Sequence, residues 1–256
     1  MIVSTGFNLT AIAPEWSSGM VDTIHGVIPF RTAMVNEATI YAVTRNGFRT
    51  ACPPHAVNHL GIMAAFKTLR VSKVLATSMV GSLREEIPPG TVVILDQFLD
   101  FTRTRSNTIF GPEGFAFCDF TEPYCPAQRN VFIAACEQLG LPHQPTGCYV
   151  GVDGPRYETA AEVKMYRLLG GDIVGMTNIP ESIYARENGL CYAAAALVVN
   201  YGAGLASKVT RLDCYEQTLH HIGDMELLLK QALQLLPQVS TACACSTVAD
   251  DVIRLR

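Results

Sequence analysis

The stretch of this 256-residue chain that most constrains its fold is residues 151–205, where turns, helices and buried strands follow one another almost without spacer. It begins with a turn, continues with an amphipathic helix and a buried strand, and ends with a second helix and a second buried strand. Such alternation is typical of an α/β protein with a central, mainly parallel or mixed sheet and helices on both faces. Ligands bind beyond the carboxyl ends of the strands in open sheets of this kind. The residues expected to line one pocket there are Tyr157, Met176, Thr177 and Asn200.

Periodic apolar segments outside this stretch complete the predicted sheet and its helical cover. Strands are expected at residues 2–5, 38–45, 72–76, 91–95 and 147–152, and helices at residues 57–69, 128–139 and 212–235. Residues 102–126 form a long irregular loop with four phenylalanines, a composition that favours a functional role or a subunit contact. Because no linker, repeat or low-complexity run interrupts the chain, we predict one domain over residues 1–238 and a tail over residues 239–256.

The composition favours a protein that binds a small molecule. The net charge of -4 offers no basic face for nucleic acid. The N-terminus lacks the basic segment of a signal peptide, and the longest apolar run, residues 191–199, is too short to span a bilayer. We therefore predict a soluble, cytoplasmic protein without a nucleic-acid or membrane partner.

The nine cysteines show no framework spacing, which favours reduced structural thiols. Cys136 and Cys191 lie inside apolar segments. Cys243 and Cys245 form a close pair in the tail, but no histidine or cysteine follows at the spacing of a metal ligand. We assign no metal.

Three other segments carry residues suited to an anion. Ser4 follows the first strand directly before a glycine turn, and Arg45 ends a strand beside the turn dipeptide Asn46-Gly47. Ser78 lies in a small hydroxyl-rich segment after the strand at residues 72–76, where hydroxyls and backbone amides can face a ligand. An ordinary turn at Ser4 and a solvated Arg45 are equally open alternatives.

Motif searches exclude several kinds of chemistry. The chain has no nucleophile elbow, no Walker loop, no dinucleotide fingerprint and no zinc-protease motif. An aromatic ring, a thioether, hydroxyls, an arginine and an amide suit a flat neutral ligand together with a small anion. Taken singly, Tyr157 and Met176 also fit core positions, and Asn200 could satisfy backbone groups at the end of its strand.

With these residues in place, the chain resembles the nucleoside phosphorylase superfamily, in the branch of trimeric purine nucleoside phosphorylases and methylthioadenosine or methylthioinosine phosphorylases. The resemblance covers roughly residues 38–235 and leaves the C-terminal tail outside. The matching motifs are PPHAVNHLGIMAAFKTL, ATSMVGSLREEIPPGTVVILDQFLDFT, EPYCP, GPRYETAAEVKMYRLLGGDIVGMTNIPE, AREN and CYAAAALVVNYGAG. It implies a single-domain nucleoside phosphorylase fold, a central mixed sheet flanked by helices.

The resemblance also implies phosphorolysis, in which inorganic phosphate attacks the anomeric carbon and a purine leaves. No cofactor is expected, and phosphate is the co-substrate. Transition-state charge on the sugar and the departing base is then stabilised by placed groups rather than by a covalent nucleophile. By position, Ser4, Arg45, Ser78 and Thr177 would hold phosphate, Met176 would pack under the sugar, Tyr157 would contact the base, and Asn200 would bind it catalytically at N7 and its 6-substituent.

Asn200 carries the expected base preference. Methylthioadenosine phosphorylases have aspartates here and two residues on, where this chain has Gly202. An amide can donate to an oxygen at position 6, so we expect 6-oxopurines to be preferred over adenine. Residues 209–213 would select between a hydroxyl and a methylthio group at the 5′ position of the sugar. Their side chains are a mixture of apolar and charged groups, so they do not decide between the two substituents. The overall match favours the methylthioinosine type.

The resemblance implies a homotrimer or hexamer, with residues 110–124 as the expected subunit contact. Phe117 stands where the family has a histidine contributed across the interface. Two phosphate elements depart from the family pattern: the N-terminal glycine loop is reduced to residues 4–6, and Asn46 replaces a histidine. Two alternatives therefore stay open, a non-catalytic purine or nucleoside binding protein and a nucleosidase that uses water.

Overall fold

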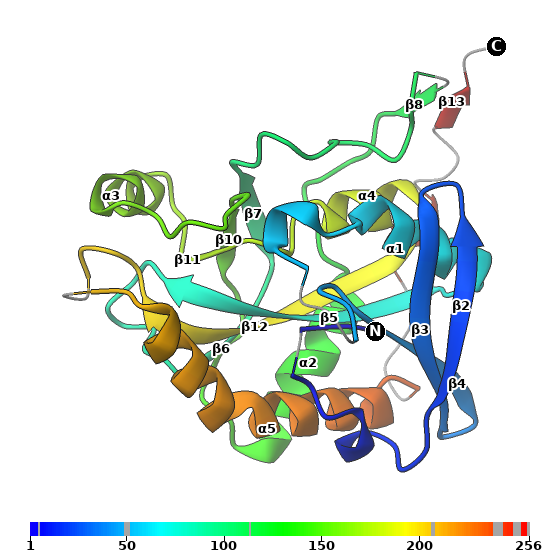
Figure 1. Ribbon diagram of the computed structural model, residues 1–256, viewed down its shortest axis with the longest axis horizontal. Helices are drawn as coiled ribbons and strands as arrows, with labels where there is room; N and C mark the ends of the chain where they lie inside the picture. The colour runs from blue at the N-terminus through cyan, green and yellow to red at the C-terminus, as the bar shows by residue number, and fades with distance from the viewer. Residues whose placement is uncertain are drawn as a thin grey trace.

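The computed structural model describes residues 1–4, 6–48, 52–112, 114–205, 208–237, 243–247 and 252–254. A mixed sheet of 11 strands crosses the centre of this described part (Figure 1). Its main path runs β2-β3-β4-β1-β5-β11-β10-β7, and β12 joins β5 to the pair β6-β9. The strands outside the centre are β2 (Ser17–Thr23), β3 (Gly26–Val35), β4 (Ala38–Thr44), β6 (Val92–Ile94), β7 (Gln97–Asp100), β9 (His143–Gln144), β10 (Cys148–Gly151) and β11 (Ile173–Gly175).

The middle of the sheet is formed by three mutually parallel strands, β1 (Ile2–Val3), β5 (Lys73–Ser82) and β12 (Cys191–Tyr201). Almost every residue of β5 and β12 is buried. Strands that are covered on both faces have near-continuous apolar sequences, and the alanine and valine run of β12 is such a sequence. The predicted α/β class with a mixed central sheet is confirmed.

Helices cover both faces of the sheet. On one face lie α2 (Pro126–Leu139) and the long α5 (Arg211–Leu235), which share a core with β6 and β12 (Figure 1). On the other lie α1 (His59–Thr68) and α4 (Glu181–Glu187), and α3 (Ala160–Leu168) covers the edge near β10 and β11. Short 3-10 turns occur at Leu9–Ala11 and Pro54–Ala56.

Local sequence explains where these helices begin and end. Thr159 and Glu162 form a capping box at the start of α3, and the hydroxyl of Thr210 accepts from the backbone N–H of Asp213 at the start of α5. Gly140 ends α2 with φ of 64°, a left-handed conformation that glycine adopts without strain. The predicted helices at residues 57–69, 128–139 and 212–235 are confirmed to within two residues.

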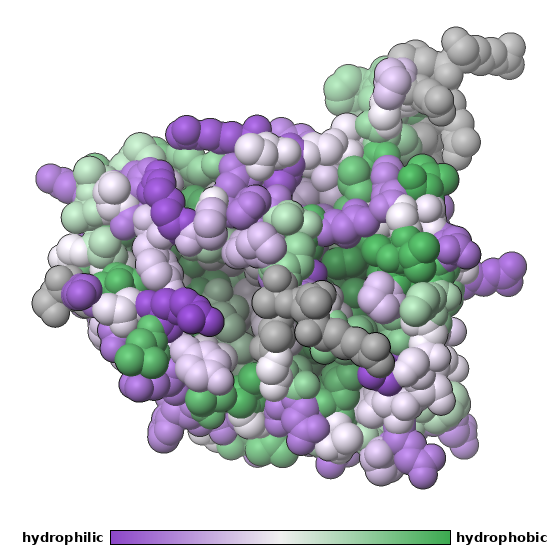
Figure 2. All heavy atoms as spheres, in the orientation of Figure 1, coloured by the Kyte–Doolittle hydropathy of each residue, from purple (hydrophilic) through white to green (hydrophobic). Residues whose placement is uncertain are grey.

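Two features of the sheet differ from the expectation. Residues 17–35 form the hairpin β2-β3, which the sequence patterns do not predict, and Figure 2 shows hydrophobic side chains gathered over it. The strand expected to end at Ala76 continues to Ser82, so Ser78 lies inside β5 rather than after it. The continued part of β5 pairs with β12, and its last residues, Gly81 and Ser82, also pair with β11.

The C-terminal tail is partly described. Residues 243–247 contain a turn, and β13 (Val252–Arg254) pairs antiparallel with β8 (Gly114–Ala116) of the long loop. The other residues of the predicted tail, and Thr5 of the first predicted turn, lie outside the described residues. Among the residues that are described, no helix combines the length and apolar character needed to cross a membrane.

Candidate active site

A cavity of about 340 Å³ lies at the carboxyl ends of β1, β4, β5, β11 and β12. Five of the predicted site residues line it, although they come from four separate parts of the chain: Ser4, Tyr157, Met176, Thr177 and Asn200. The crevice beyond the strand ends is where an open α/β sheet binds ligands. The structure therefore brings these five residues together.

Arg45 and Ser78 lie behind the wall of this cavity. Neither lines it, but their neighbours Asn46 and Met79 do. Continuing the register from Val3↔Thr44 and Ile2↔Ala76 puts Arg45 and Ser78 on either side of Ser4, in one row across three strands. The predicted phosphate residues thus share one level of the sheet, while only Ser4 and Thr177 face the open space.

The guanidinium of Arg45 is held in a buried ion pair with Glu181. Nε and Nη2 donate to the two carboxylate oxygens at 2.5 and 2.8 Å, and Nη1 donates to the carbonyl of Thr77. The hydroxyl of Tyr192 also donates to Glu181, at 2.8 Å. Arg45 is thus neither the solvated side chain nor the open anion ligand of the sequence expectation, because α4 delivers a carboxylate to it.

Burial and charge act against each other in this cluster. Burial by itself raises the pKa of Glu181, but the charge of Arg45, together with hydrogen bonding from His59 and Arg45, holds that pKa below its ordinary value. Burial lowers the pKa of His59, whose Nδ1 lies 3.4 Å from Glu181. The imidazole is therefore neutral near pH 7, and Arg45 alone balances the carboxylate.

Several buried hydroxyls beside this cluster have no hydrogen-bond partner within the described part of the chain. They are the side-chain oxygens of Thr44, Thr77 and Ser78. A buried hydroxyl without a partner costs about 1–3 kcal/mol, so such groups gather where a ligand or water satisfies them. Their position beside Ser4 is consistent with an anion at this end of the cavity.

Met176 and Thr177 are positioned by groups from three other segments. Gly154 has a φ of 66°, and an added Cβ would lie 2.3 Å from the sulfur of Met176, so a side chain there would be strained and would displace Met176. The hydroxyl of Tyr149 accepts from the backbone N–H of Thr177 at 3.1 Å. Arg105, from the long irregular loop, donates to the carbonyl of Met176 at 2.6 Å. This loop therefore supports the site, as its composition suggested.

Asn200 sits near the end of β12, directly after an irregularity in its pairing with β5 between Val198 and Asn200. Such bulges re-aim side chains next to functional sites. The Asn200 amide donates to the carbonyl of Tyr201 at 2.9 Å and packs over Gly81, where an added Cβ would lie 3.0 Å from its nitrogen. One N–H of the amide fixes its orientation, and the second can donate to a ligand.

Gly202 is held where a side chain fits poorly. Its N–H donates to the carbonyl of Ser82 at 2.8 Å, and an added Cβ would lie 3.1 Å from Val163 and 3.2 Å from that same carbonyl. An aspartate at this position would therefore need the backbone or Val163 to move.

Four residues of α5 complete the cavity wall and were not predicted individually: Arg211, Cys214, Tyr215 and Thr218. Their spacing of three and four residues places them on one face of the helix, which was the available signal. The hydroxyl of Tyr157 donates to the sulfur of Cys214 at 3.5 Å, so the turn and the helix meet over the cavity. Residues 209–213, expected near the 5′ end of the sugar, lead into this wall.

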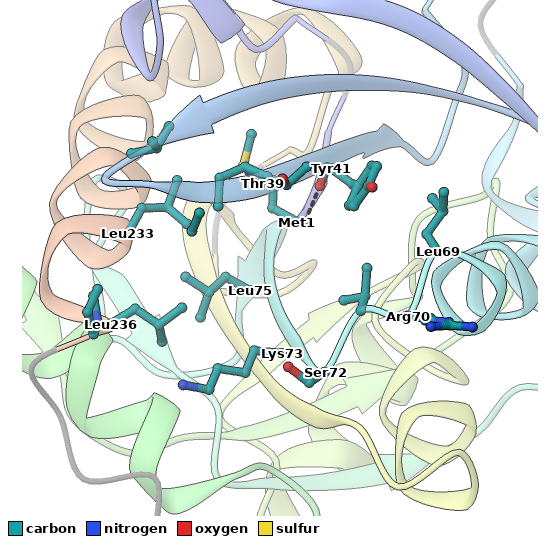
Figure 3. Close-up of a pocket in the computed structure, with 15 residues that line it drawn as sticks. Met1, Thr39, Tyr41, Leu69, Arg70, Ser72, Lys73, Leu75, Leu233 and Leu236 are labelled. Atoms are coloured by element: carbon teal, nitrogen blue, oxygen red, sulfur yellow. Dashed lines mark hydrogen bonds between the residues drawn. The ribbon is translucent and has the colours of Figure 1, made fainter.

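A larger cavity of about 500 Å³ lies at the opposite, amino-terminal ends of β1, β4 and β5. Figure 3 shows its mostly apolar lining, with Leu233 and Leu236 at the end of α5 facing Leu75. The terminal amine of Met1 donates to the carbonyl of Tyr41 at its edge. None of the predicted site residues lines it, so the smaller cavity is the candidate active site.

Comparison with known proteins agrees with this geometry. Residues 4–232 match the phosphorylase superfamily. The chain is 41% identical to a 6-oxopurine nucleoside phosphorylase of Pyrococcus furiosus, over 88% of each chain, and 36% identical to a probable S-methyl-5'-thioinosine phosphorylase of Methanopyrus kandleri. The latter match covers 88% of both chains.

A solved methylthioadenosine phosphorylase from an antarctic soil metagenomic library superposes with a TM-score of 0.90 at 28% identity. The match covers 98% of this chain and 91% of that one. The protein belongs to the phosphorylase superfamily. Within it, the relatives are purine nucleoside phosphorylases and methylthionucleoside phosphorylases, which confirms the predicted family and the nucleoside phosphorylase fold.

Proposed function

We propose that this protein cleaves purine nucleosides with inorganic phosphate, giving the free base and ribose 1-phosphate or 5-methylthioribose 1-phosphate, with 6-oxopurines preferred. The observation that supports this proposal most directly is that one cavity is lined by five predicted site residues: Ser4, Tyr157, Met176, Thr177 and Asn200. The enzyme class itself, a phosphorylase acting on purine nucleosides, follows from the family and the named relatives.

In this proposal Asn200 recognises the purine. Its free N–H donates to N7 or to the 6-oxygen, and the bond to Tyr201 keeps the amide in that orientation. The absence of a carboxyl group at position 202 removes the second acidic group expected for adenine recognition. The close neighbours of Gly202 support this assignment, because an aspartate there would require Val163 or the backbone at Ser82 to shift.

Phosphate would be held at the other end of the cavity. Ser4 and Thr177 face it directly, and the hydroxyl of Ser78 supplies a further donor from behind the wall. Arg45 orders this row of residues by donating to the carbonyl of Thr77, and its charge is balanced by Glu181. Met176 packs under the sugar, and Tyr157 covers the base from the α5 side.

In this proposal the side chains that line the cavity supply the groups that the reaction needs, with inorganic phosphate as co-substrate and no cofactor. The anomeric carbon gains positive charge as the bond to the base breaks, and a phosphate anion beneath it stabilises that charge. The N–H of Asn200 stabilises the negative charge that gathers on the leaving purine.

The 5′ substituent would contact the α5 wall. Cys214 and Tyr215 offer a soft, partly apolar surface suited to a methylthio group, whereas Arg211 and Thr218 suit a hydroxyl. A probable methylthioinosine phosphorylase and a 6-oxopurine nucleoside phosphorylase are both among the relatives. We propose that 5′-methylthioinosine is accepted alongside inosine.

We also propose a homotrimer or hexamer. Large apolar side chains are strongly exposed at the β2-β3 hairpin and in the long loop, with Ile24 94% and Phe117 80% accessible. Exposed apolar groups of this size favour a subunit contact. Residues 110–124 remain the predicted place for it.

The test is an initial-rate assay of inosine, guanosine, 5′-methylthioinosine and 5′-methylthioadenosine, each with and without phosphate, and with arsenate replacing phosphate. We expect turnover only with phosphate or arsenate, and faster turnover of the 6-oxopurines. Cleavage without either anion would identify a nucleosidase. No turnover, with a calorimetric signal for purine, would identify a binding protein.

A further inference from the structure

Four cysteines that are far apart in the sequence meet in one cluster, outside the candidate active site. They are Cys125, Cys191, Cys243 and Cys245, and their sulfur atoms all lie within 4.8 Å of one another. The sulfurs of Cys191 and Cys243 lie 3.4 Å apart. The first two come from the folded domain, and the last two come from the tail beyond the matched residues 4–232.

Two of the four cysteines, Cys125 and Cys191, are held by regular structure. Cys125 is the N-cap residue of α2, and its backbone N–H donates to the carbonyl of Tyr192 at 2.8 Å. Cys191 is the first residue of β12 and donates its backbone N–H to Ser72 at 3.0 Å. The backbones of Cys125 and Cys191 are therefore held in place by bonds that do not involve the tail.

The tail supplies its two thiols from a short turn. The N–H and hydroxyl of Thr247 both donate to the carbonyl of Ala244, at 3.2 and 2.7 Å. Cys245 is buried with 3% of its surface exposed, and Cys243 is partly buried. The turn thus points both cysteines inward toward Cys125 and Cys191.

The spacing within the cluster matches a tetrahedral metal site. Zinc binds thiolates at about 2.3 Å, so four sulfurs at the corners of a tetrahedron lie roughly 3.8 Å apart. The contact at 3.4 Å and the outer limit of 4.8 Å bracket that separation. The thiols gather as one group of four rather than as two separate pairs. Cys125 also lies at a helix N-terminus, where a thiolate is stabilised.

We propose that Cys125, Cys191, Cys243 and Cys245 bind a structural zinc ion, which fastens the C-terminal tail to the start of α2 and β12. The sequence pattern alone indicates no metal site, because the tail pair has no partner nearby in the sequence. The partners are 52 and 118 residues upstream of Cys243. Four protein ligands leave no open position, so the ion has no catalytic role.

The position of the cluster suggests what the ion stabilises. The neighbours of two of its ligands, Tyr124 and Tyr192, donate to Asn178 and Glu181 at 2.6 and 2.8 Å. Asn178 follows Thr177 directly, and Glu181 holds Arg45. Fastening the tail at this point therefore supports the backbone of the segment that carries Thr177, without any contact to substrate.

The experiment measures zinc by elemental analysis in the purified full chain, together with thiol alkylation and intact mass. We expect one zinc ion per chain, and four thiols that resist alkylation until a chelator is added. In Cys243→Ser/Cys245→Ser the zinc content should fall by at least about tenfold. The matched control Cys52→Ser/Cys148→Ser removes two partly buried thiols elsewhere and should keep its zinc.

A second measurement does not depend on a variant that folds. Chelator treatment of the wild-type protein should lower Tm by more than about 5 °C, and added zinc should restore it. Cobalt loaded in its place should give the absorption of tetrahedral thiolate ligation. Zinc-free protein with the four thiol hydrogens missing from its mass would overturn the proposal in favour of two disulfides. Zinc-free protein with four reactive thiols would overturn it as well.

Discussion

The two ends of the candidate active site are built in different ways. At the base end, Asn200 depends on its own strand, with one hydrogen bond to the next residue and a glycine beneath it. At the phosphate end, Arg45 depends on a carboxylate that lies 136 residues away in sequence and on a buried tyrosine hydroxyl. The base end is local and open, whereas the phosphate end is a buried network. Substitutions at the base end should therefore change specificity, and substitutions that break the buried ion pair at the phosphate end should change stability.

The strongest test of this contrast is Glu181→Ala. It leaves the guanidinium of Arg45 buried without its partner, which should lower the free energy of unfolding by about 3–5 kcal/mol. Urea unfolding followed by circular dichroism measures it. The matched control is Glu162→Ala, which breaks an ion pair with the exposed Arg156 and should cost only about 1 kcal/mol. Equal losses in the two variants would contradict the account.

Acid should weaken the same network. The pKa of Glu181 is depressed in the folded state, so its contribution to stability is present above its ordinary pKa of 4.5 and is lost as the pH falls below that value. The stability advantage of the wild type over Glu181→Gln should therefore shrink between about pH 5 and about pH 2. Urea titrations of both proteins across this range measure it. An advantage that grows as the pH falls would have the wrong sign.

Substitutions at Thr177 and Ser78 distinguish a hydroxyl that faces the phosphate end of the cavity from one that is buried behind its wall. Thr177→Val removes a hydroxyl that faces the cavity, so kcat/KM for phosphate should fall about 10- to 100-fold, as expected for one hydrogen bond to a charged group. Ser78→Ala removes a buried hydroxyl without a partner in the described structure, so the free energy of unfolding should stay the same or rise by up to about 1–3 kcal/mol, while KM for phosphate rises. If that KM stays unchanged, Ser78 does not belong to the phosphate site.

The smallest effect is expected at Tyr157. Its ring covers the cavity, but its hydroxyl makes only a weak contact with the sulfur of Cys214 at 3.5 Å. Tyr157→Phe should therefore change kcat/KM for the nucleoside by less than about threefold, and Tyr157→Ala should lower it by about tenfold because the ring contact is lost. Comparison of the two variants in the same assay shows whether ring or hydroxyl matters.

Much of the fold could be predicted because its signals are local. The helices at residues 128–139 and 212–235 follow from periodicity and caps, and the strand of residues 191–201 follows from its apolar run. The hairpin of residues 17–35 was missed because its strands are largely exposed and lack a continuous apolar pattern. The end of β5 was misplaced because small buried hydroxyl residues look like a turn in sequence.

The candidate active site shows the same difference between residues with local sequence signals and residues whose position depends on long-range packing. Tyr157, Met176 and Asn200 lie at strand ends or in a turn of one continuous stretch, so their convergence could be anticipated. The pairing of Arg45 with Glu181 could not, because it depends on how α4 packs against the sheet. The cysteine cluster is a similar case, since its four members come from three distant segments.

The central claim is that Asn200 sets the preference for 6-oxopurines. The most direct measurement is the ratio of kcat/KM for inosine to that for adenosine, at saturating phosphate, in the wild type and in Asn200→Asp. The wild type should favour inosine at least about tenfold, and the variant should lower that ratio at least about tenfold while Tm stays near the wild-type value. A wild type that cleaves adenosine as fast as inosine, or a variant with an unchanged ratio, would contradict the account.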